Sequence, residues 1–489
     1  MNKPFTHWAL AGFLFILFMV PLDLLGQGKS TTLKVVASND QLPIIGATIQ
    51  LSNLDFSGGW LTDASGTAVL PLEKPSEISI SFLGFIGTKK IVNPGETITV
   101  VLEEDLLGLN EVVVTGAFAP TTMQNSLYKV KKFDAALIEA RGAVNLSDLL
   151  QTQLNLKTIQ DDVLGTRIVM QGISGPNVKI LIDGIPLVNG TGGEFDLSQI
   201  NMNNVERVEI VEGPLSVQYG TNALAGTINI ITKAHSGEDW SVNSSVYYES
   251  VGQYNTDFTV AKGWDNTSIS IGGSRNQFNG FSSTGERKKN WVPRTQYLAN
   301  GKLRTKIQDL NLVAAVDKLW QNSTSPGNAT RAFNNRTNKI SDIANDNYNN
   351  TDRLNASFVI EGKLSEKGYL NLVNGYSSFE QSSRKYLQDI IDDIKWLSSD
   401  AEDHDTTHFE TFTFRGTYVY GNTDKKEGLY LTTGYEASLN YAEGGRISAE
   451  AKGNVNEYGL FSALEIPLSK KFKVQPSVRY TYSNSYDTR

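Results

Sequence analysis

The chain has 489 residues, a formal net charge of -8 and a hydrophobic share of 40%. This length allows several domains, and the apolar share is sufficient for packed cores, so disorder is not the default expectation. The acidic balance, with no basic stripe, argues against a nucleic-acid partner. The absence of cysteine excludes disulfides, thiolate metal sites, cysteine nucleophiles and a lipid-modified N-terminal cysteine.

The N-terminus has the features of an export signal. Lys3 precedes an apolar run from Ala9 to Val20, which Pro21 breaks and which small or polar residues follow at 26–30. The run is too short to span a bilayer. We predict that residues 1–26 are a cleaved signal peptide, with a short buried helix as the alternative. No later stretch approaches about 20 unbroken apolar residues, so a membrane role would not use helices.

Residues 30–104 follow the period of short β-strands. Apolar residues alternate with polar ones around Ile49, Ile80 and Val100, and Asp63 to Gly66 is a turn signal. Frequent turns with a period of two predict a small immunoglobulin-like β-sandwich.

Residues 117–235 mix two periods. Leu146, Leu149, Leu150 and Leu154 have helical spacing, and Ser147 and Asp148 supply polar groups near the start of that helix. Strands are expected at 167–171, 178–182, 205–211 and 227–232, and the second of them ends in the turn pair Asp183-Gly184. These elements predict a compact α/β domain.

Residues 236–489 consist of long ladders with one apolar and one polar face. The ladder at 429–441 is uninterrupted, and similar ladders occur at 310–320, 354–364, 412–420, 458–466 and 472–482. The connections between them alternate between short (265–266, 305–308, 365–368, 421–427, 467–471) and long (279–293, 321–352, 381–407, 441–454). A soluble sandwich is the alternative, but this alternation favours a transmembrane β-barrel with short turns at one end and long loops at the other.

The number of ladders indicates an incomplete barrel. About eleven strands are expected, and in an antiparallel barrel an odd number cannot close without exposing unpaired backbone groups to lipid. Barrels with a plugged lumen have about 22 strands, so the ladders account for about half of one. We therefore expect that Arg489 is not the natural end of the fold. The alternative is a miscount by one strand and a small, complete barrel.

Three motifs carry a resemblance to a known family. They are "NLSDLLQTQLNL" (145–156), "ILIDGIPL" (180–187) and "VERVEIVEGPLSVQYGTNALAGTINIITK" (205–233). Together they resemble the plug domain of TonB-dependent outer-membrane receptors. The β-sandwich resembles the carboxypeptidase-regulatory-like domain that such receptors carry in the Bacteroidetes lineage. One departure is Gln171 in "MQGISG", where the family usually has arginine, so no electrostatic role is assigned to it.

The segment "LNEVVVTG" (109–116), within a linker at 105–116, resembles the TonB box of this family. The resemblance implies that the TonB energy-transducing complex binds it from the periplasm by adding a strand, a geometry that successive valines favour. The expected TonB-binding residues are Glu111, Val112, Val113, Val114 and Thr115. The alternative is that the valines form the last strand of the sandwich or the first strand of the plug.

Other candidate sites are weaker. The plug tip Gly190, Thr191, Gly192 and Gly193 is a candidate ligand contact, although such loops are often plain connectors. His404 and His408 in "EDHDTTH" are weak metal candidates in what reads as a solvated acidic loop, so no metal and no cofactor is expected. With four histidines and no His-Glu-x-x-His motif, no enzyme activity is expected. Helical spacing at 387–397 predicts a short external helix.

The resemblance implies active import of a scarce solute across the outer membrane of a Gram-negative cell, with the barrel in contact with membrane lipid. The expected cargo is a ferric siderophore, haem, a cobalamin-like cofactor or another chelate. The alternatives are a binding or signalling receptor and a glycan-uptake receptor. The all-strand period of residues 31–104 argues against signalling, because signal-transducing members carry an N-terminal domain of mixed pattern.

Overall fold

The computed structural model describes residues 30–38, 41–51, 59–72, 74–82, 85–103, 112–115, 121–122, 126–153, 155–161, 165–188, 194–220, 223–235, 238–421, 428–445, 447, 452–469 and 472–485. The chain divides into two compact units, Met1–Leu109 and Asn110–Arg489. Among the described residues, no helix has the length and apolar character needed to cross a membrane.

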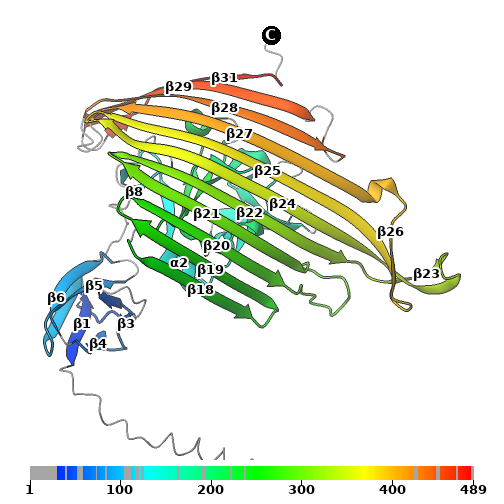
Figure 1. The fold of residues 1–489 in the computed structure, drawn as a ribbon, viewed down its shortest axis with the longest axis horizontal. Coiled ribbons are helices and arrows are strands. Elements are labelled where there is room, and N and C mark those ends of the chain that lie inside the picture. The colour runs from blue at the N-terminus through cyan, green and yellow to red at the C-terminus, as the bar shows by residue number, and fades with distance from the viewer. Residues whose placement is uncertain are drawn as a thin grey trace, which may run out of the picture. The chain divides into compact units, whose positions relative to one another are not determined.

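The first unit is a β-sandwich, as predicted (Figure 1). Its strands are β1 (Thr31–Ala37), β2 (Thr48–Leu51), β3 (Trp60–Leu61), β4 (Thr67–Leu70), β5 (Ser76–Ser81), β6 (Thr88–Val92) and β7 (Thr97–Leu102). One sheet has the order β4-β1-β7 and the other β3-β2-β5-β6. The alternating apolar residues form the shared core, in which Val35, Ile49 and Ile78 have no exposed surface. The period of two in the sequence therefore has its physical cause in a sheet with one buried face.

The second unit begins with the plug. Its elements are β8 (Val112–Val113), β9 (Thr121–Thr122), β10 (Val130–Asp134), α2 (Ala135–Ala140), α3 (Leu146–Leu150), β11 (Leu156–Asp161), β12 (Gly165–Met170), β13 (Ile173–Ser174), η2 (Gly175–Asn177), β14 (Val178–Ile182), β15 (Ile185–Pro186), η4 (Leu197–Gln199), β16 (Val205–Glu212), α4 (Ser216–Tyr219) and β17 (Gly226–Thr232). The main sheet has the order β10-β16-β17-β14-β15, and β14 and β17 are parallel. The predicted α/β domain is confirmed.

Two local features explain why this sequence folds as a plug. Helix α3 begins with a capping box in which the Asn145 side chain accepts from the Asp148 N–H and the Asp148 carboxylate accepts from the Asn145 N–H. Asp148, one of the polar residues noted near the start of this helix, thus belongs to the cap, together with Asn145. Gly226 has a φ of +151°, and a Cβ there would lie 2.3 Å from the Val211 carbonyl oxygen and 2.5 Å from Met170 Sδ. Only glycine allows this close approach between β16 and β17.

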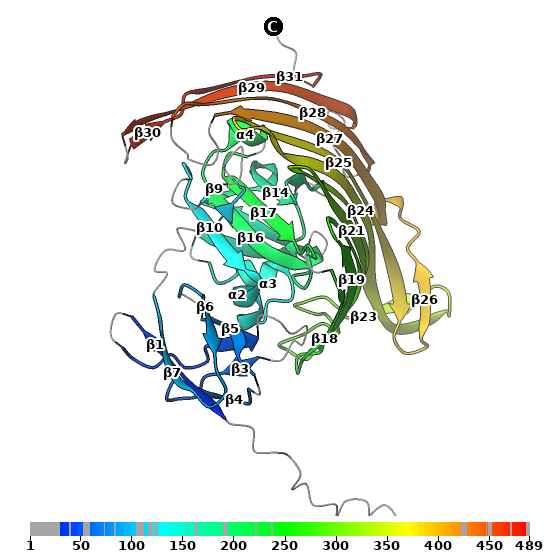
Figure 2. The same cartoon turned by 60° about the vertical axis from the view of Figure 1, so that its left-hand side comes forward.

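The rest of the second unit is one large antiparallel sheet. Its strands are β18 (Trp240–Glu249), β19 (Gln253–Trp264), β20 (Thr267–Phe278), β21 (Arg294–Ile307), β22 (Leu310–Pro326), β23 (Thr330–Asn334), β24 (Lys339–Ser365), β25 (Gly368–Asp389), β26 (Ile394–Leu397), β27 (His404–Tyr420), β28 (Tyr430–Gly444), β29 (Gly453–Ser469), β30 (Phe472–Val474) and β31 (Ser477–Ser483). Neighbours in the sheet follow sequence order. Three strands lie off this path: β23 pairs with β24, β26 with β25 and β31 with β29. Figure 2 shows the sheet curving around one side of the plug. The path β18 to β30 has eleven strands, as expected.

The two faces of this large sheet, called the wall below, differ in polarity. Large aromatic residues of the wall, such as Trp240, Trp264 and Trp320, are exposed. The face toward the plug buries polar side chains, among them Gln296 and Arg353. Apolar-out and polar-in alternation is the pattern of an outer-membrane barrel wall.

The predicted long connections 321–352 and 381–407 are largely strand. β24 and β25 pair without a register shift from Lys363 and Tyr369 up to Ile343 and Asp389, far past the length that crosses a bilayer. The predicted helix at 387–397 is wrong, because β26 folds back onto the end of β25 as a hairpin. The Asp389 carboxylate accepts the N–H groups of residues 391 and 392, which fixes a turn instead of a helix.

Candidate functional site

The valine segment lies against the plug. β8 pairs with β9, Val112 with Thr122 and Val113 with Thr121. The Val113 side chain has no exposed surface and packs in a plug cluster that includes Val130 and Leu181. The segment is therefore docked by both backbone pairing and apolar packing.

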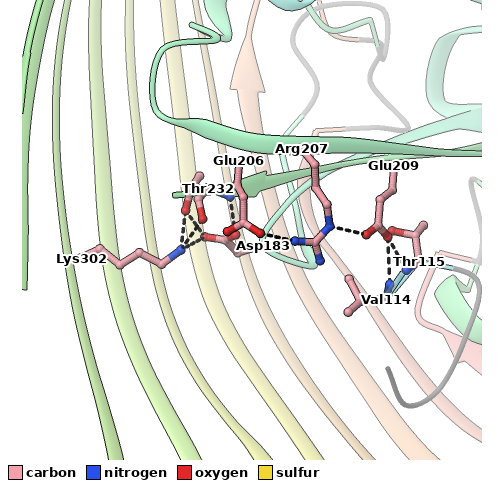
Figure 3. A network of polar contacts seen from close by, with 8 residues as sticks. All are labelled: Val114, Thr115, Asp183, Glu206, Arg207, Glu209, Thr232 and Lys302. Carbon is pink, nitrogen blue, oxygen red and sulfur yellow. Dashed lines mark hydrogen bonds and ion pairs between the residues drawn. The ribbon is translucent and has the colours of Figure 1, made fainter. Parts of the chain in front are cut away.

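A buried glutamate on β16 holds the end of this segment (Figure 3). Glu209 Oε2 accepts hydrogen bonds from the backbone N–H groups of Val114, at 3.0 Å, and Thr115, at 2.7 Å. Arg207 Nε donates to Glu209 Oε1 at 2.8 Å. The Glu209 side chain is fully buried, so this carboxylate is tolerated only because these three donors compensate it. The docked position of the segment and the burial of the Glu209 carboxylate therefore depend on each other.

A single amide connects the segment to the β14–β15 turn. Asn229 Nδ2 donates to Thr115 Oγ1 at 3.0 Å, and Asn229 Oδ1 accepts from the Gly184 N–H at 3.1 Å. Asn229 is 2% exposed. Asp183 and Gly184 have φ angles of +49° and +81°, which fits the predicted Asp-Gly turn. The turn and the segment thus share one buried side chain.

The same turn touches the wall. Lys302 on β21 donates to Asp183 Oδ2 at 3.0 Å and to the Thr232 carbonyl at 3.1 Å, and it also contacts Thr232 Oγ1 (Figure 3). Thr232 in turn donates its N–H to Asp183 Oδ1 at 2.9 Å. This plug–wall ion pair is mostly buried, with 12% and 16% of the Lys302 and Asp183 side chains exposed.

A second ionic contact joins the plug to the wall farther along the sheet. Lys179 on β14 contacts the Tyr219 carbonyl and lies 3.9 Å from Glu436 on β28. Arg479 on β31 donates to Glu436 Oε2 at 3.0 Å. Burial lowers the pKa of the Lys179 ammonium, although the attraction of Glu436 opposes this effect. The Arg415 guanidinium lies 5.1 Å from the centre of the Tyr219 ring, and Arg415 donates to the Gly184 carbonyl at 2.9 Å.

The structure treats the predicted site residues differently. Val114 and Thr115 contact Glu209, Val113 is buried in the plug, and Val112 is described by its backbone alone. Glu111 and the proposed tip Gly190, Thr191, Gly192 and Gly193 lie outside the described residues.

The histidine cluster is dispersed along one strand. His404 Nε2 lies 2.9 Å from the Ser398 carbonyl, whereas His408 lies between Glu380 and Glu410. Four residues on a strand span roughly 13 Å, too far for one metal ion. Among the described residues, no group of three or more His, Cys, Asp or Glu side chains is placed to hold a metal.

Sequence reasoning missed Glu209 and Asn229. A signal was present for both: each is a polar residue between apolar neighbours in a strand, as in "VEIV" and "INII". A polar residue at such a position is buried only with specific partners. The partner of both is Thr115, more than ninety residues earlier in the chain.

The comparisons with known proteins agree with this architecture. Residues 122–227 match the model of the TonB-dependent Receptor Plug Domain. The chain is 32% identical over 136 residues to the vitamin B12 transporter BtuB of Vibrio cholerae, an alignment that covers 27% of this chain and 22% of the relative.

Solved structures are similar over a larger part of the chain. The ferric-catecholate import receptor Fiu of E. coli K12, in its closed form, has a TM-score of 0.57 and 14% identity, covering 76% of this chain and 58% of that one. The siderophore receptor PirA of Acinetobacter baumannii has a TM-score of 0.54 and 17% identity, covering 74% and 57%. The chain thus spans less than a quarter of the curated relative and less than two thirds of these structures. At these identities the structures establish the fold alone.

Proposed function

Because residues 122–227 match the plug domain of TonB-dependent receptors and the following sheet has the fold of their barrels, we propose that the chain imports a scarce solute across the outer membrane with energy from TonB. The supporting observation is the docked segment 112–115, held on the plug by Glu209 and Asn229. A segment that transmits force must be tied to the element that moves, and these buried hydrogen bonds provide that tie.

An importer of this kind has a defined orientation in the outer membrane. The short turns of the wall, such as 265–266, 308–309 and 366–367, face the periplasm, and the long β22–β25 extensions face outward. Residues 1–26 then act as the export signal. The linker 105–116 presents its valine segment to the periplasmic domain of TonB, which binds it by strand addition.

The segment has to change partners for this binding. In the docked state β8 is paired with β9 and the N–H groups of Val114 and Thr115 are bound to Glu209. Strand addition by TonB competes with the β9 pairing, and pulling then breaks the Glu209 and Asn229 hydrogen bonds. Each such bond contributes about 1 to 3 kcal/mol, so a modest force on the segment suffices.

The β-sandwich at residues 30–104 is proposed to be a carboxypeptidase-regulatory-like domain of the Bacteroidetes type, with a periplasmic location. The cargo is proposed to be a small chelate of the classes that the relatives' names mention, a ferric siderophore or a cobalamin. The abundance of the protein in its host, grown with and without an iron chelator, distinguishes a siderophore from a cobalamin cargo. Only an importer of an iron chelate should become more abundant under iron starvation.

The test is uptake by the full-length protein carrying Val113→Pro, with Val113→Ala as the matched control. Proline removes the backbone N–H and blocks strand addition, whereas alanine keeps the backbone intact. Uptake of radiolabelled ferric enterobactin and of cyanocobalamin is measured in cells with and without TonB. We expect uptake of one probe that requires TonB and is lost in Val113→Pro but retained in Val113→Ala. TonB-independent uptake, or equal uptake by both variants, would contradict the proposal.

A further inference from the structure

We propose that the solute path runs between the plug and strands β21 to β25 of the wall, and that the Lys302–Asp183–Thr232 cluster is the gate that closes it. This inference rests on the proposed function, and it adds the route and the closing residues. Three observations carry it: two stacked cavities, an apolar seal at the same turn, and the link from this turn to the docked segment.

Two cavities lie between plug and wall and meet at this cluster. One, of about 80 Å³, extends over Leu298 on β21 and Arg353 on β24. The other, of about 310 Å³, extends over Arg304 and Glu361. Both are lined by the same three residues, Asp183, Thr232 and Lys302.

The cavities follow each other along the barrel axis. Arg304 and Glu361 lie near the short-turn ends of β21 and β24, whereas Leu298 and Arg353 lie farther from the short turns. The smaller cavity is therefore the outer one and the larger cavity the periplasmic one. The Lys302 ion pair lies at the boundary between them, where it blocks passage from one to the other.

An apolar contact closes the path beside the ion pair. Ile185, directly after the Asp183-Gly184 turn, packs against Val359 on β24 and Val373 on β25. A Cβ added at Gly375 would lie 2.5 Å from Ile185 Cγ2, so the wall has a glycine where the plug side chain presses against it. The seal and the ion pair belong to one short stretch, residues 183–185.

Residues 183–185 are connected to the docked segment 112–115. Val114 lines the periplasmic cavity, and Asn229 joins Thr115 to the Gly184 N–H. Removing the segment opens the floor of the lower cavity and takes away the hydrogen-bond partner of Asn229. The 183–185 turn then loses one of its supports, which favours release from Lys302.

The first experiment measures KCl conductance of the purified full-length protein in planar bilayers. Lys302→Ala combined with Ile185→Ala removes the ion pair and the apolar contact of the gate, and leaves the Arg415 hydrogen bond to the Gly184 carbonyl in place. The control, Arg331→Ala with Ile340→Ala, removes one cation and one aliphatic side chain from the exposed β23–β24 extension. We expect about a tenfold rise in conductance for the gate variant and none for the control. Wild-type conductance in a folded gate variant would overturn the proposal.

The second experiment locks the gate. The Cβ atoms of residues 185 and 375 would lie about 4 Å apart or less, within the range a disulfide requires, and the chain contains no native cysteine. Ile185→Cys with Gly375→Cys, once oxidised, should abolish uptake of the probe identified above, and reduction should restore it. The control pair Thr267→Cys with Thr305→Cys joins two wall strands, where the hydroxyls lie 2.8 Å apart, and should leave uptake unchanged.

The proposed gate and the proposed import function can be refuted by different results. Conductance requires neither TonB nor cargo, so it reports on the gate even if TonB does not drive the protein. Suppose instead that Val113→Pro abolishes uptake, while the engineered disulfide between positions 185 and 375, confirmed by mass spectrometry, leaves uptake intact. The import function then stands and the path lies elsewhere.

Discussion

Asn229 donates a hydrogen bond to the Thr115 hydroxyl across 3.0 Å, and both side chains are almost completely buried. A residue of the linker is thereby fixed to the central sheet of the plug. The other end of the same amide accepts from Gly184, at the turn that contacts the wall. Displacement of the linker is therefore transmitted to the plug–wall contact through one side chain.

The first prediction concerns this amide. Asn229→Ala removes the hydrogen bond that ties the Thr115 hydroxyl to the plug, worth about 1 to 1.5 kcal/mol, so the undocked fraction of the segment should rise about fivefold to tenfold. A spin label on Val112→Cys reports the mobility of the segment, because residues 1–489 contain no native cysteine. The matched control is Asn243→Ala on the exposed β18. Equal label mobility in the Asn229 variant and the control would contradict the account.

The second prediction concerns the buried carboxylate. Glu209→Ala leaves the N–H groups of Val114 and Thr115 without their acceptor and Arg207 without its buried partner, which should cost about 3 kcal/mol in the free energy of unfolding of the plug. Glu206→Gln alters the half-exposed partner of the same arginine and should change stability by less than about 1 kcal/mol. Chemical denaturation of both variants measures the difference. A similar loss in the two would refute a special role for Glu209.

The third prediction tests the close approach of β16 and β17. Gly226→Ala places a methyl group 2.3 Å from the Val211 carbonyl and should destabilise the plug by about 2 to 3 kcal/mol. Gly213 also has a positive φ, +110°, but its added Cβ would meet no atom within 4 Å. Gly213→Ala therefore costs backbone strain alone, about 1 kcal/mol. Denaturation midpoints that do not separate the two variants would contradict the packing described.

The fourth prediction concerns pH at the tip of the outer extension. The Ser341 hydroxyl, the Asn334 amide and two backbone N–H groups bind the Asp389 carboxylate and lower its pKa to about 2, although burial opposes this shift. The pKa of Asp389 is lower in the folded state than its unfolded value near 3.9. The ionised carboxylate therefore stabilises the tip at pH values above about 3.9, and this stabilisation is lost as pH falls toward about 2.

Hydrogen exchange at 390–397 should therefore accelerate between about pH 4 and about pH 2 in the wild type, after correction for the intrinsic pH dependence of exchange. In Asp389→Asn, exchange should be fast throughout and the pH step should be absent. The control Asp392→Asn, which alters an exposed carboxylate, should keep the step. A step of equal size in the Asp389 variant would assign the titration to another group.

The sequence predicted the elements better than their contacts. Strands such as 178–182 and the eleven wall strands follow from the period of two, because a sheet with two different faces imposes it. The Asp183-Gly184 turn was predictable for the same local reason. Helical spacing at 387–397 failed, because pairing with β25 and the Asp389 turn override a weak local preference.

The candidate site was predictable only in part. A strand of successive valines indicates an extended backbone, and the resemblance supplied its role as a hypothesis. The partners Glu209, Asn229 and Lys302 are distant in sequence, so no local pattern connects them with Thr115. The outer strand extensions resemble loops in the sequence for a similar reason. Their polar residues, such as Asp346, are held by partners from distant parts of the chain, including Arg287 in the connection between β20 and β21.

The measurement that tests the central claim most directly is disulfide cross-linking of the segment to the periplasmic domain of TonB. Single cysteines replace Val112, Val113 and Val114 in turn, and the control is a cysteine at Ser65, an exposed turn residue of the sandwich. Each variant is produced in cells together with a series of TonB domains that carry one cysteine at successive positions, and disulfide formation between the two proteins is measured. Coupling by strand addition predicts cross-links at all three valine positions, none at Ser65, and their loss when Pro replaces the residue beside the cysteine. Cross-links no more frequent at the valines than at Ser65 would contradict the account.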